Sequence, residues 1–388
     1  MRRRQTGKYA KSVVSGETVQ AFIPDPLPPK PPLAPDADLA HRMNDAHVKL
    51  GRLDGVAGTL PDTHLFLYAY VRKEAVLSSQ IEGTQSSLSD LLLFELEEAP
   101  GTPLDDVIEV SNYVAAMEHG LARVRGGFPL SNRLIREMHR ILLARGRGRN
   151  SGPGEFRRSQ NWIGGTRPGN ARFVPPPHSE VEPCMADLER FLHDQPERTA
   201  TLLKAAMAHV QFETIHPFLD GNGRVGRLMI TLLLCIEGVL REPLLYLSLF
   251  LKQNRSRYYE LLGRVRTEGD WEEWVRFFMT GVAETAEQAV ATAQRLGAIA
   301  KADRVSIQGT GRIAGSALRV HHHLLERPIS TIAAVAGGTK LSVPTVTKAL
   351  NALERLELVS EVTGRKRGRI FRYDSYLDEL QRGTEPLP

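Results

Sequence analysis

The sequence is poor in the features of secreted and membrane proteins. Only two cysteines occur in 388 residues, Cys184 and Cys235, so the chain has neither a disulfide framework nor a CxxC zinc motif. The longest apolar run, at 228–240, contains Glu237 and is too short to cross a bilayer. The basic N-terminal segment lacks the apolar stretch of a signal peptide. These absences predict a cytoplasmic protein with no membrane-spanning segment.

Net charge is also missing from most of the chain. The protein has 50 Lys and Arg against 45 Asp and Glu, a net charge of +5. Residues 301–388 contain 14 of the basic and 9 of the acidic residues, so the whole excess lies there. The length predicts two or three domains. Because the excess positive charge is confined to residues 301–388, the C-terminal domain is expected to differ from the others in its charge and its partners.

Proline is concentrated at one place. Seven prolines lie between Pro24 and Pro35, which excludes a helix and favours an extended conformation. Residues 1–40 are therefore expected to form an irregular arm. The arm could be a ligand for a partner protein, but an ordered segment lying across its own domain is favoured. From residue 39 onward, apolar residues recur at helical spacing, which predicts an all-α body.

The loop HPFLDGNGRVGR, residues 216–227, joins two apolar helices. A simple turn between two helices needs only a residue that tolerates positive φ. The concentration of reactive side chains in this loop therefore needs another explanation. Gly221, Asn222 and Gly223 are placed at a helix N-terminus, where free N–H groups and the helix dipole form an anion site. The loop is therefore predicted to bind phosphate.

Charged and titratable side chains surround this anion site. Arg224 and Arg227 are three residues apart in the first turn of the helix. One of them can therefore bind phosphate oxygens while the other faces the opposite side of the anion site. Asp220 can hold Mg²⁺ carried in by phosphates, and His216 is a base that titrates near neutral pH. Together these groups predict phosphoryl or nucleotidyl transfer.

The same loop resembles the signature of the Fic family, HxFx[DE]GNGRxxR, and a chance match to its eight fixed positions is negligible. The resemblance implies a Fic fold and protein adenylyltransferase activity, in which AMP moves from ATP to a Ser, Thr or Tyr hydroxyl of a target protein. One relative transfers phosphocholine with the same motif, so ATP is implied rather than shown. The matching residues are His216, Phe218, Asp220, Gly221, Asn222, Gly223, Arg224 and Arg227.

The resemblance also implies a role for each group. His216 would take the proton from the target hydroxyl, which then attacks the α-phosphorus. Asp220 would hold Mg²⁺ between the α- and β-phosphates, and Arg227 would meet the γ-phosphate. Phe218 would bury its ring and fix the loop. The phosphates would be cradled by Gly221, Asn222, Gly223 and Arg224.

A second stretch, SSQIEG, resembles the family's inhibitory pattern [ST]xxxE[GN]. Ser78 and Glu82 share a helical face, and Gly83 is a natural C-cap. The helix dipole disfavours a glutamate in a last turn, so a cation is expected to meet it. In the family this glutamate pairs with the second arginine of the loop, here Arg227, and blocks γ-phosphate placement. The resemblance therefore implies an enzyme restrained by its own N-terminal region.

Two further stretches extend the resemblance. Residues 161–177 resemble the flap that docks a target segment by strand addition, with a purely structural hairpin as the alternative. QNRSRYYELL resembles the segment that lines the adenine pocket, with Asn254 and Tyr258 as base contacts, although core packing is an alternative for the tyrosine. His139 and His178 have no partners at metal-binding spacing and are interpreted as structural.

The basic C-terminal region resembles a winged helix-turn-helix. Residues 330–356 predict two helices separated by a turn at Gly337 and Gly338, and residues 359–373 predict two strands that flank the basic turn TGRKRGR. DNA binding through 330–373 and a role only in dimers or target docking are equal alternatives. Base edges would be met by Ser342, Thr345, Thr347 and Lys348, and phosphates by Arg365, Lys366, Arg367 and Arg369.

The resemblance implies an all-α fold with a short β-hairpin flap and a small C-terminal winged-helix domain, an order of parts typical of a bacterial group of Fic proteins. A homodimer is plausible, but no interface is indicated. Two other functions stay open: a DNA-binding regulator that senses nucleotide, and a hydrolase that removes AMP with Glu82 aligning a water. The expected parts are an arm at 1–40, a helical region with the inhibitory helix at 41–104, the catalytic core at 105–295 and the winged helix at 300–388.

Overall fold

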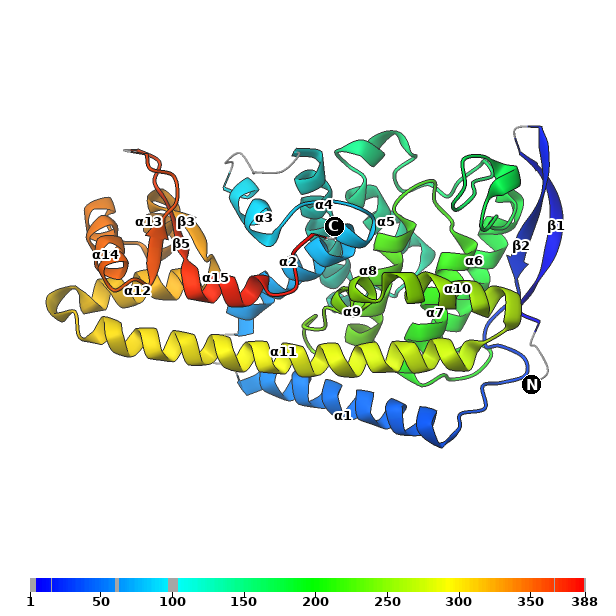
Figure 1. Cartoon of the computed structure of the whole chain (residues 1–388), viewed down its shortest axis with the longest axis horizontal. Helices are drawn as coiled ribbons and strands as arrows, with labels where there is room; N and C mark the ends of the chain where they lie inside the picture. The colour runs from blue at the N-terminus through cyan, green and yellow to red at the C-terminus, as the bar shows by residue number, and fades with distance from the viewer. Residues whose placement is uncertain (1–4, 15, 60–62, 97–103, 366, 387–388) are drawn as a thin grey trace.

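Helices make up most of the structure, as the sequence predicts, and the strands form two small antiparallel sheets near the ends of the chain (Figure 1). The computed structural model describes residues 5–14, 16–59, 63–96, 104–365 and 367–386. None of the helices in these ranges is long and apolar enough to cross a membrane. The fold class is therefore all-α with a small β content.

Two buried helices carry the loop HPFLDGNGRVGR. Nearly all side chains of α7 (Thr201–Ile215) and α8 (Asn222–Ile236) are buried, and helices that are buried on every side lie in the centre of a helical body. The loop therefore lies at one end of the core. The other helices of this part are α2 (Thr63–Ile81), α3 (Leu88–Phe94), α4 (Leu104–Arg125), α5 (Asn132–Leu142), α6 (His178–Leu192), α9 (Ser248–Gln253), and the short 3₁₀ helices η1 (Arg147–Asn150) and η2 (Pro168–Asn170).

One long helix runs along the length of the body (Figure 1). The helical pattern is broken at Gly269, whose φ of 67° ends α10 (Arg255–Glu268), and Asp270 caps the start of α11 (Trp271–Gln308). α1 (Ala37–Thr59) lies alongside α11. Because α11 is continuous through residues 295–300, where the sequence predicts a boundary between parts, the core and the C-terminal region share a helix.

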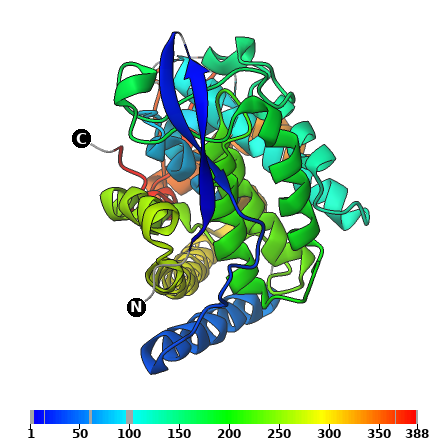
Figure 2. The ribbon, with the colours of Figure 1, turned by 90° about the vertical axis from the view of Figure 1, so that its right-hand side faces the viewer.

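The prediction that residues 1–40 are irregular is wrong for their first half. β1 (Gly7–Val14) pairs with β2 (Glu17–Pro24) in an antiparallel hairpin with Gly16 in its turn, which Figure 2 shows in front of the helices. β-Branched and aromatic residues on both sides of Gly16 fit this hairpin, but the neighbouring prolines dominate the pattern of the region.

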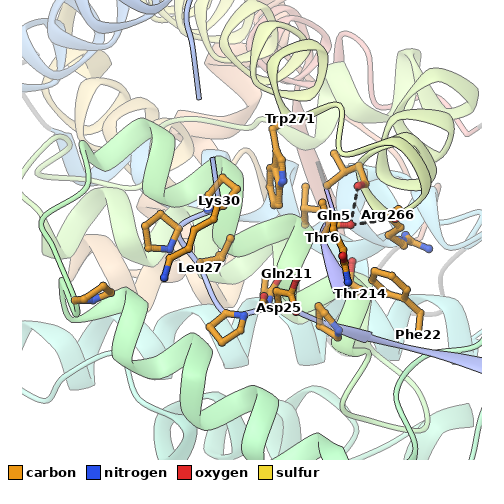
Figure 3. A pocket seen from close by; sticks show the side chains of 17 residues that line it. Gln5, Thr6, Phe22, Asp25, Leu27, Lys30, Gln211, Thr214, Arg266 and Trp271 are labelled. Atoms are coloured by element: carbon orange, nitrogen blue, oxygen red, sulfur yellow. Dashed lines mark hydrogen bonds between the residues drawn. The ribbon is translucent and has the colours of Figure 1, made fainter. Parts of the chain in front are cut away.

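The Pro-rich segment after this hairpin is an ordered arm, as expected. The amide of Gln211 donates to the carbonyl of Asp25 at 2.9 Å, and the Ala34 amide donates to Glu272 Oε1 at 3.1 Å. Figure 3 shows the arm residues facing Trp271 across a cavity of about 310 Å³. The arm therefore covers α7 and α11 of its own body, which favours a structural role over that of a partner ligand.

The C-terminal region forms a second small unit. Its predicted turn at Gly337 and Gly338 is misplaced, because both glycines lie inside a helix that ends at Lys340, where φ is 53°. A side chain at Gly338 would come within 2.5 Å of the His323 ring, so this glycine permits two helices to approach closely. The elements are η3 (Gly311–Ile313), α12 (Ala314–Glu326), β3 (Ile329–Thr331), α13 (Ile332–Thr339), α14 (Val343–Arg355), β4 (Val359–Glu361), β5 (Ile370–Tyr373) and α15 (Asp374–Gln381), with strand order β3-β5-β4.

Candidate active site

The loop between α7 and α8 begins at a residue held in an uncommon conformation. His216 ends α7 with φ 48° and ψ 60°, a left-handed geometry that costs a non-glycine residue about 1–2 kcal/mol. Buried Arg157 stabilises it by donating from Nε to the His216 carbonyl at 2.9 Å, and the same guanidinium binds the carbonyls of Ser159 and Pro176. Arg157 therefore joins the start of the loop to the segment that is expected to be the flap.

The interior of the loop is fixed by one asparagine. The Asn222 Oδ1 accepts from the Phe218 amide at 2.9 Å, and its Nδ2 donates to the Phe218 carbonyl at 2.9 Å. The Phe218 ring is fully buried. The Asn222 side chain, which the sequence places among the anion-binding groups, is therefore occupied within the loop, and only its main-chain N–H is left to face an anion.

α8 starts where the sequence expects an anion site. Gly221 precedes the helix with φ 79°, and the amides of Asn222 and Gly223 are among those that a helix leaves without intrahelical partners. The Gly221 amide donates to Oδ1 of its neighbour Asp220 at 2.6 Å, and the Asp220 side chain is 44% exposed. The turn thus presents a carboxylate beside free amides.

The two arginines of the loop have different partners. Arg224 is buried and binds Oε2 of Glu109 on α4 at 3.1 Å and Asp220 Oδ1 at 3.4 Å. Glu109 also accepts from Arg147. Sequence reasoning missed Glu109, because nothing near it in the chain indicates a partner 115 residues away. Arg224 is therefore neutralised within the protein, while Arg227 points elsewhere.

Arg227 meets the end of α2. Its Nη2 donates to Glu82 Oε1 at 2.7 Å and to the Ser78 carbonyl at 2.9 Å, and its Nε donates to the Ser78 hydroxyl at 2.7 Å. Burial alone would raise the pKa of Glu82, but the charges of Arg227 and Arg224 outweigh burial and lower it. Glu82 is thus a carboxylate paired with the second arginine of the loop.

Two glycines allow this pair to form. Gly83 follows Glu82 with φ 103°, a conformation that a side chain would strain, and it turns the chain away from α2. A side chain at Gly223 would come within 2.2 Å of Glu82 Oε1, so only glycine lets the carboxylate lie over the N-terminus of α8. The glutamate therefore occupies space that an anion bound at this terminus would need.

A cavity of about 780 Å³ opens beside this pair. That volume falls within the range of small-molecule sites. Burial, together with the charges of Arg157 and Arg266, lowers the pKa of His216 to about 4, so its ring is neutral at physiological pH. The lining residues include His216, Gly223, Arg227, Glu82, Glu213, Tyr258, Tyr259, Arg255 and Arg266, with Ile163, Gly164, Arg172 and Phe173 from the expected flap.

Two segments of the chain match known family descriptions. Residues 40–122 match "Fic/DOC family N-terminal", and residues 129–234, which include the loop, match "Fic/DOC family". These matches identify a Fic/DOC N-terminal region and a Fic/DOC domain within the chain. We refer to residues 216–227, which lie within the second match, as the Fic loop.

Relatives of known name match the same region. "Protein adenylyltransferase Fic" of Drosophila melanogaster is 33% identical over 178 residues, which are 46% of this chain and 33% of that protein. Its counterpart in Drosophila persimilis is 31% identical over 256 residues, 62% of this chain and 47% of that protein. The chain thus spans from a third to about half of the length of these curated relatives.

Solved structures have the same fold. A Fic family protein from Desulfovibrio desulfuricans G20 has a TM-score of 0.57 at 21% identity, over 89% of this chain and 98% of that one. Fic-1 from C. elegans has a TM-score of 0.52 at 22% identity, over 67% of this chain and 74% of that one. At these identities the likeness concerns the fold alone.

The residues expected to contact adenine are only partly at the cavity. Tyr258 lines it, but its hydroxyl lies 2.8 Å from His209 Nε2, deep in the core. Asn254 is not among the lining residues, and its Nδ2 donates to the Phe250 carbonyl at 3.0 Å. Tyr259 and Arg255, which the sequence reasoning did not select, line the cavity from the same helix, α10. α10 thus lines the cavity through Tyr258, Tyr259 and Arg255, while Asn254 does not line it.

α2 also contacts the last described residues of the chain. The Gln80 amide donates to the Thr384 carbonyl at 2.8 Å, and Lys252 Nζ donates to Gln80 Oε1 at 2.7 Å and to the carbonyl of Glu385. Gln80 occupies a variable position of the inhibitory pattern, so the motif gave no indication of these contacts. The last described residues thus bind α2 two positions before Glu82.

Proposed function

We propose that this Fic protein transfers AMP from ATP to a hydroxyl side chain of a target protein and that Glu82 restrains the transfer. The observation that carries the proposal is one cavity that brings together His216, Arg227, Gly223 at the N-terminus of α8 and the flap residues Ile163 and Phe173. Relatives named protein adenylyltransferase support the same reaction.

In this reaction His216 acts as the general base. Its lowered pKa keeps the ring neutral, so it can accept the proton of a Ser, Thr or Tyr hydroxyl. The hydroxyl oxygen forms a bond to the α-phosphorus as the bond to the β-phosphate oxygen breaks, and pyrophosphate leaves with the electron pair. The amides at the start of α8 stabilise the negative charge on the phosphates.

A magnesium ion fits Asp220. Mg²⁺ in nucleotide sites is held by one or two carboxylates plus substrate phosphates, and Asp220 is a partly exposed carboxylate beside free amides. Among the described residues no group of three or more His, Cys, Asp or Glu could hold a metal, so phosphates and water would supply the remaining ligands. When bound, the ion would neutralise charge on the phosphates.

The flap 161–177 would present the target. Within it Ile163 pairs with Phe173, and the Phe22 amide of β2 donates to the Val174 carbonyl at 2.9 Å. The N-terminal hairpin thus supports the flap near Val174, while Ile163, Gly164 and Phe173 line the cavity. Docking of an extended target segment there would add affinity through main-chain bonds.

The position of the label on ATP tests this reaction directly. We expect ATP labelled at the α-phosphorus to label protein in a cell lysate, and ATP labelled at the γ-phosphorus to leave protein unlabelled, because pyrophosphate departs. Transfer of the γ-label would indicate a kinase instead. The Glu82→Gly variant should be used, since restraint in the unaltered protein lowers the signal. Absence of both labels with this variant would refute the proposal.

A second function, DNA binding by the C-terminal unit, is favoured by its exposed basic surface. Ser342 and Lys348 are exposed near the start of α14, as are Arg365 and Arg367 in the turn between β4 and β5. Lys366, which the sequence includes among the phosphate contacts, lies outside the described residues. Exposed basic side chains on α14 and in the turn between β4 and β5 suit contact with DNA phosphates.

Salt dependence would reveal this binding. We expect the whole chain to bind a DNA duplex with an affinity that falls steeply as salt rises, because phosphate contacts release counterions. Replacing Arg365 and Arg367 with alanine should lower the slope of log affinity against log salt by about two. Alanine at Lys8 and Lys11, on β1, is the matched control. An equal decrease of the slope in the control variant would indicate only non-specific electrostatic attraction between the protein and DNA.

A further inference from the structure

A buried histidine outside the Fic signature packs directly against the Fic loop. His139 on α5 has no exposed surface, and its ring stacks on that of Phe218 with centroids 3.6 Å apart and planes within 8°. Phe218 is a fixed position of the signature, so the stacked pair connects α5 to the centre of the loop. Sequence reasoning interpreted His139 as structural because no metal ligand lies at a suitable spacing from it.

Both ring nitrogens of His139 have defined partners. The Gly154 amide donates to Nδ1 at 2.8 Å, so Nδ1 carries no proton. Nε2 must then carry the proton, and it donates to the Asp220 carbonyl at 3.0 Å. A ring that accepts at Nδ1 and donates at Nε2 is the neutral imidazole. The neighbours thus select a single tautomer.

This hydrogen bond orients the peptide that carries the proposed metal ligand. The C=O and N–H groups of a trans peptide point in opposite directions, so a donor that fixes the Asp220 carbonyl also fixes the Gly221 amide. That amide donates to Asp220 Oδ1 at 2.6 Å. Gly221 also leads into α8, whose first amides follow. A single ring therefore aligns the Asp220 carboxylate and the N-terminus of α8.

We infer that His139 is a positioning residue for the Fic loop, which holds the Asp220–Gly221 peptide through its Nε2–H and the Phe218 ring through stacking. For its effect on activity the inference rests on the proposed function. A residue that only filled space would act through its shape alone, and phenylalanine could then replace it. If His139 acts through Nε2–H, any replacement must also place a hydrogen-bond donor at the Nε2 position. Without that donor the Asp220 carbonyl loses its hydrogen bond.

Three substitutions in the Glu82→Gly background separate these roles. His139→Phe keeps the ring but no polar atom. His139→Asn keeps a polar atom near the Nδ1 position, and His139→Gln places an amide donor near the Nε2 position. We expect kcat for AMP transfer to fall about 10- to 100-fold for Phe and Asn, as for other residues that orient ligands, and less than about fivefold for Gln. His119→Phe, which removes a surface contact to Glu137, is the matched control.

Two measurements do not depend on turnover. Calorimetric affinity for ATP should fall in the Phe and Asn variants and recover in the Gln variant, with unchanged helical content by circular dichroism. In the unaltered protein, long-range ¹H–¹⁵N spectra at neutral pH should show His139 protonated at Nε2 and unprotonated at Nδ1.

The outcomes against the inference are distinct from those against the proposed function. A folded Phe variant with full ATP affinity and full kcat would show that His139 only packs, as would a proton on Nδ1. If the Glu82→Gly parent transfers no AMP, the proposed function fails, and ATP affinity and the nuclear magnetic resonance spectrum then decide the role of His139. If the Gln variant is as impaired as Phe, the Nε2 donor is not the group that matters.

Discussion

Replacing Glu82 with glycine should raise AMP transfer by about 10- to 100-fold. Glu82 Oε1 holds Arg227 at 2.7 Å and lies over the N-terminus of α8, so ATP must displace this contact before its terminal phosphate can reach the arginine. A buried hydrogen bond between charged groups contributes about 1.5–3 kcal/mol, which corresponds to about 10- to 150-fold in rate. The measurement is the initial rate of α-label incorporation into target protein and into the chain itself.

The fold should survive this change. Glu82 follows the last residue of α2, where glycine is well tolerated, and the two bonds from Arg227 to Ser78 remain in the variant. Glu82→Gln should give an intermediate rate, because it keeps the volume of the side chain and loses its charge. Glu197→Gly, in an exposed loop before α7, is the matched control and should leave the rate unchanged.

The same variant separates a transferase from a hydrolase. If the chain instead removes AMP from modified proteins with Glu82 aligning a water, loss of the carboxylate should abolish that removal, and transfer should not rise. An unchanged rate of transfer in Glu82→Gly would eliminate the restraint but leave the transferase. A fall in both activities would indicate that Glu82 mainly supports the structure of α2.

The parts of the site that the sequence predicts are those set by local pattern. The start of α8 follows from Gly221 and Gly223, because helix capping acts over a few residues. The mainly helical fold class was predictable for the same reason, since helix periodicity is also local. The pairing of Arg227 with Glu82, 145 residues away, was implied only by the resemblance to the Fic family.

The parts that it misses are set by tertiary packing. Glu109 pairs with Arg224 across 115 residues, and His139 reaches Asp220 across 81, with no local pattern to indicate either contact. Asn222 is a residue type suited to an anion site, yet its side chain binds the backbone of Phe218. The buried amide and carbonyl of Phe218 would lose free energy without hydrogen-bond partners, whereas an anion in solution is already hydrated. Such choices depend on which groups the fold removes from water.

Backbone conformation explains the remaining differences between the sequence-based predictions and the structure. Gly337 and Gly338 suggest a turn by composition, but the need for α12 and α13 to approach closely places Gly338 inside a helix. In the first 24 residues, the hairpin around Gly16 has a correct strand pattern that the following prolines conceal. Composition describes a region as a whole, whereas a turn is determined by one or two residues within it.

Replacing His216 should abolish transfer while ATP still binds. Removal of a general base typically lowers the rate by about 10²- to 10⁴-fold. Alanine at this position would be strained, since φ is 48°, whereas asparagine tolerates the left-handed conformation and cannot act as the base. His216→Asn in the Glu82→Gly background is therefore the sharper variant. Its ATP affinity by calorimetry should match that of the parent, and an equal loss of affinity would mean that His216 mainly shapes the loop.

The pH dependence provides an independent check on this role. Because burial and the charges of Arg157 and Arg266 lower the pKa of His216 to about 4, the base is deprotonated throughout the neutral range. The kcat/KM of Glu82→Gly should therefore stay level as the pH falls from about 8 to about 5.5, since kcat/KM follows the ionisation of the free enzyme. The charge of Glu82 raises the pKa of His216, so removing Glu82 should move the acidic side of the pH–rate profile to lower pH. A half-maximal rate near pH 6.5 would instead indicate a histidine exposed to water in the active form.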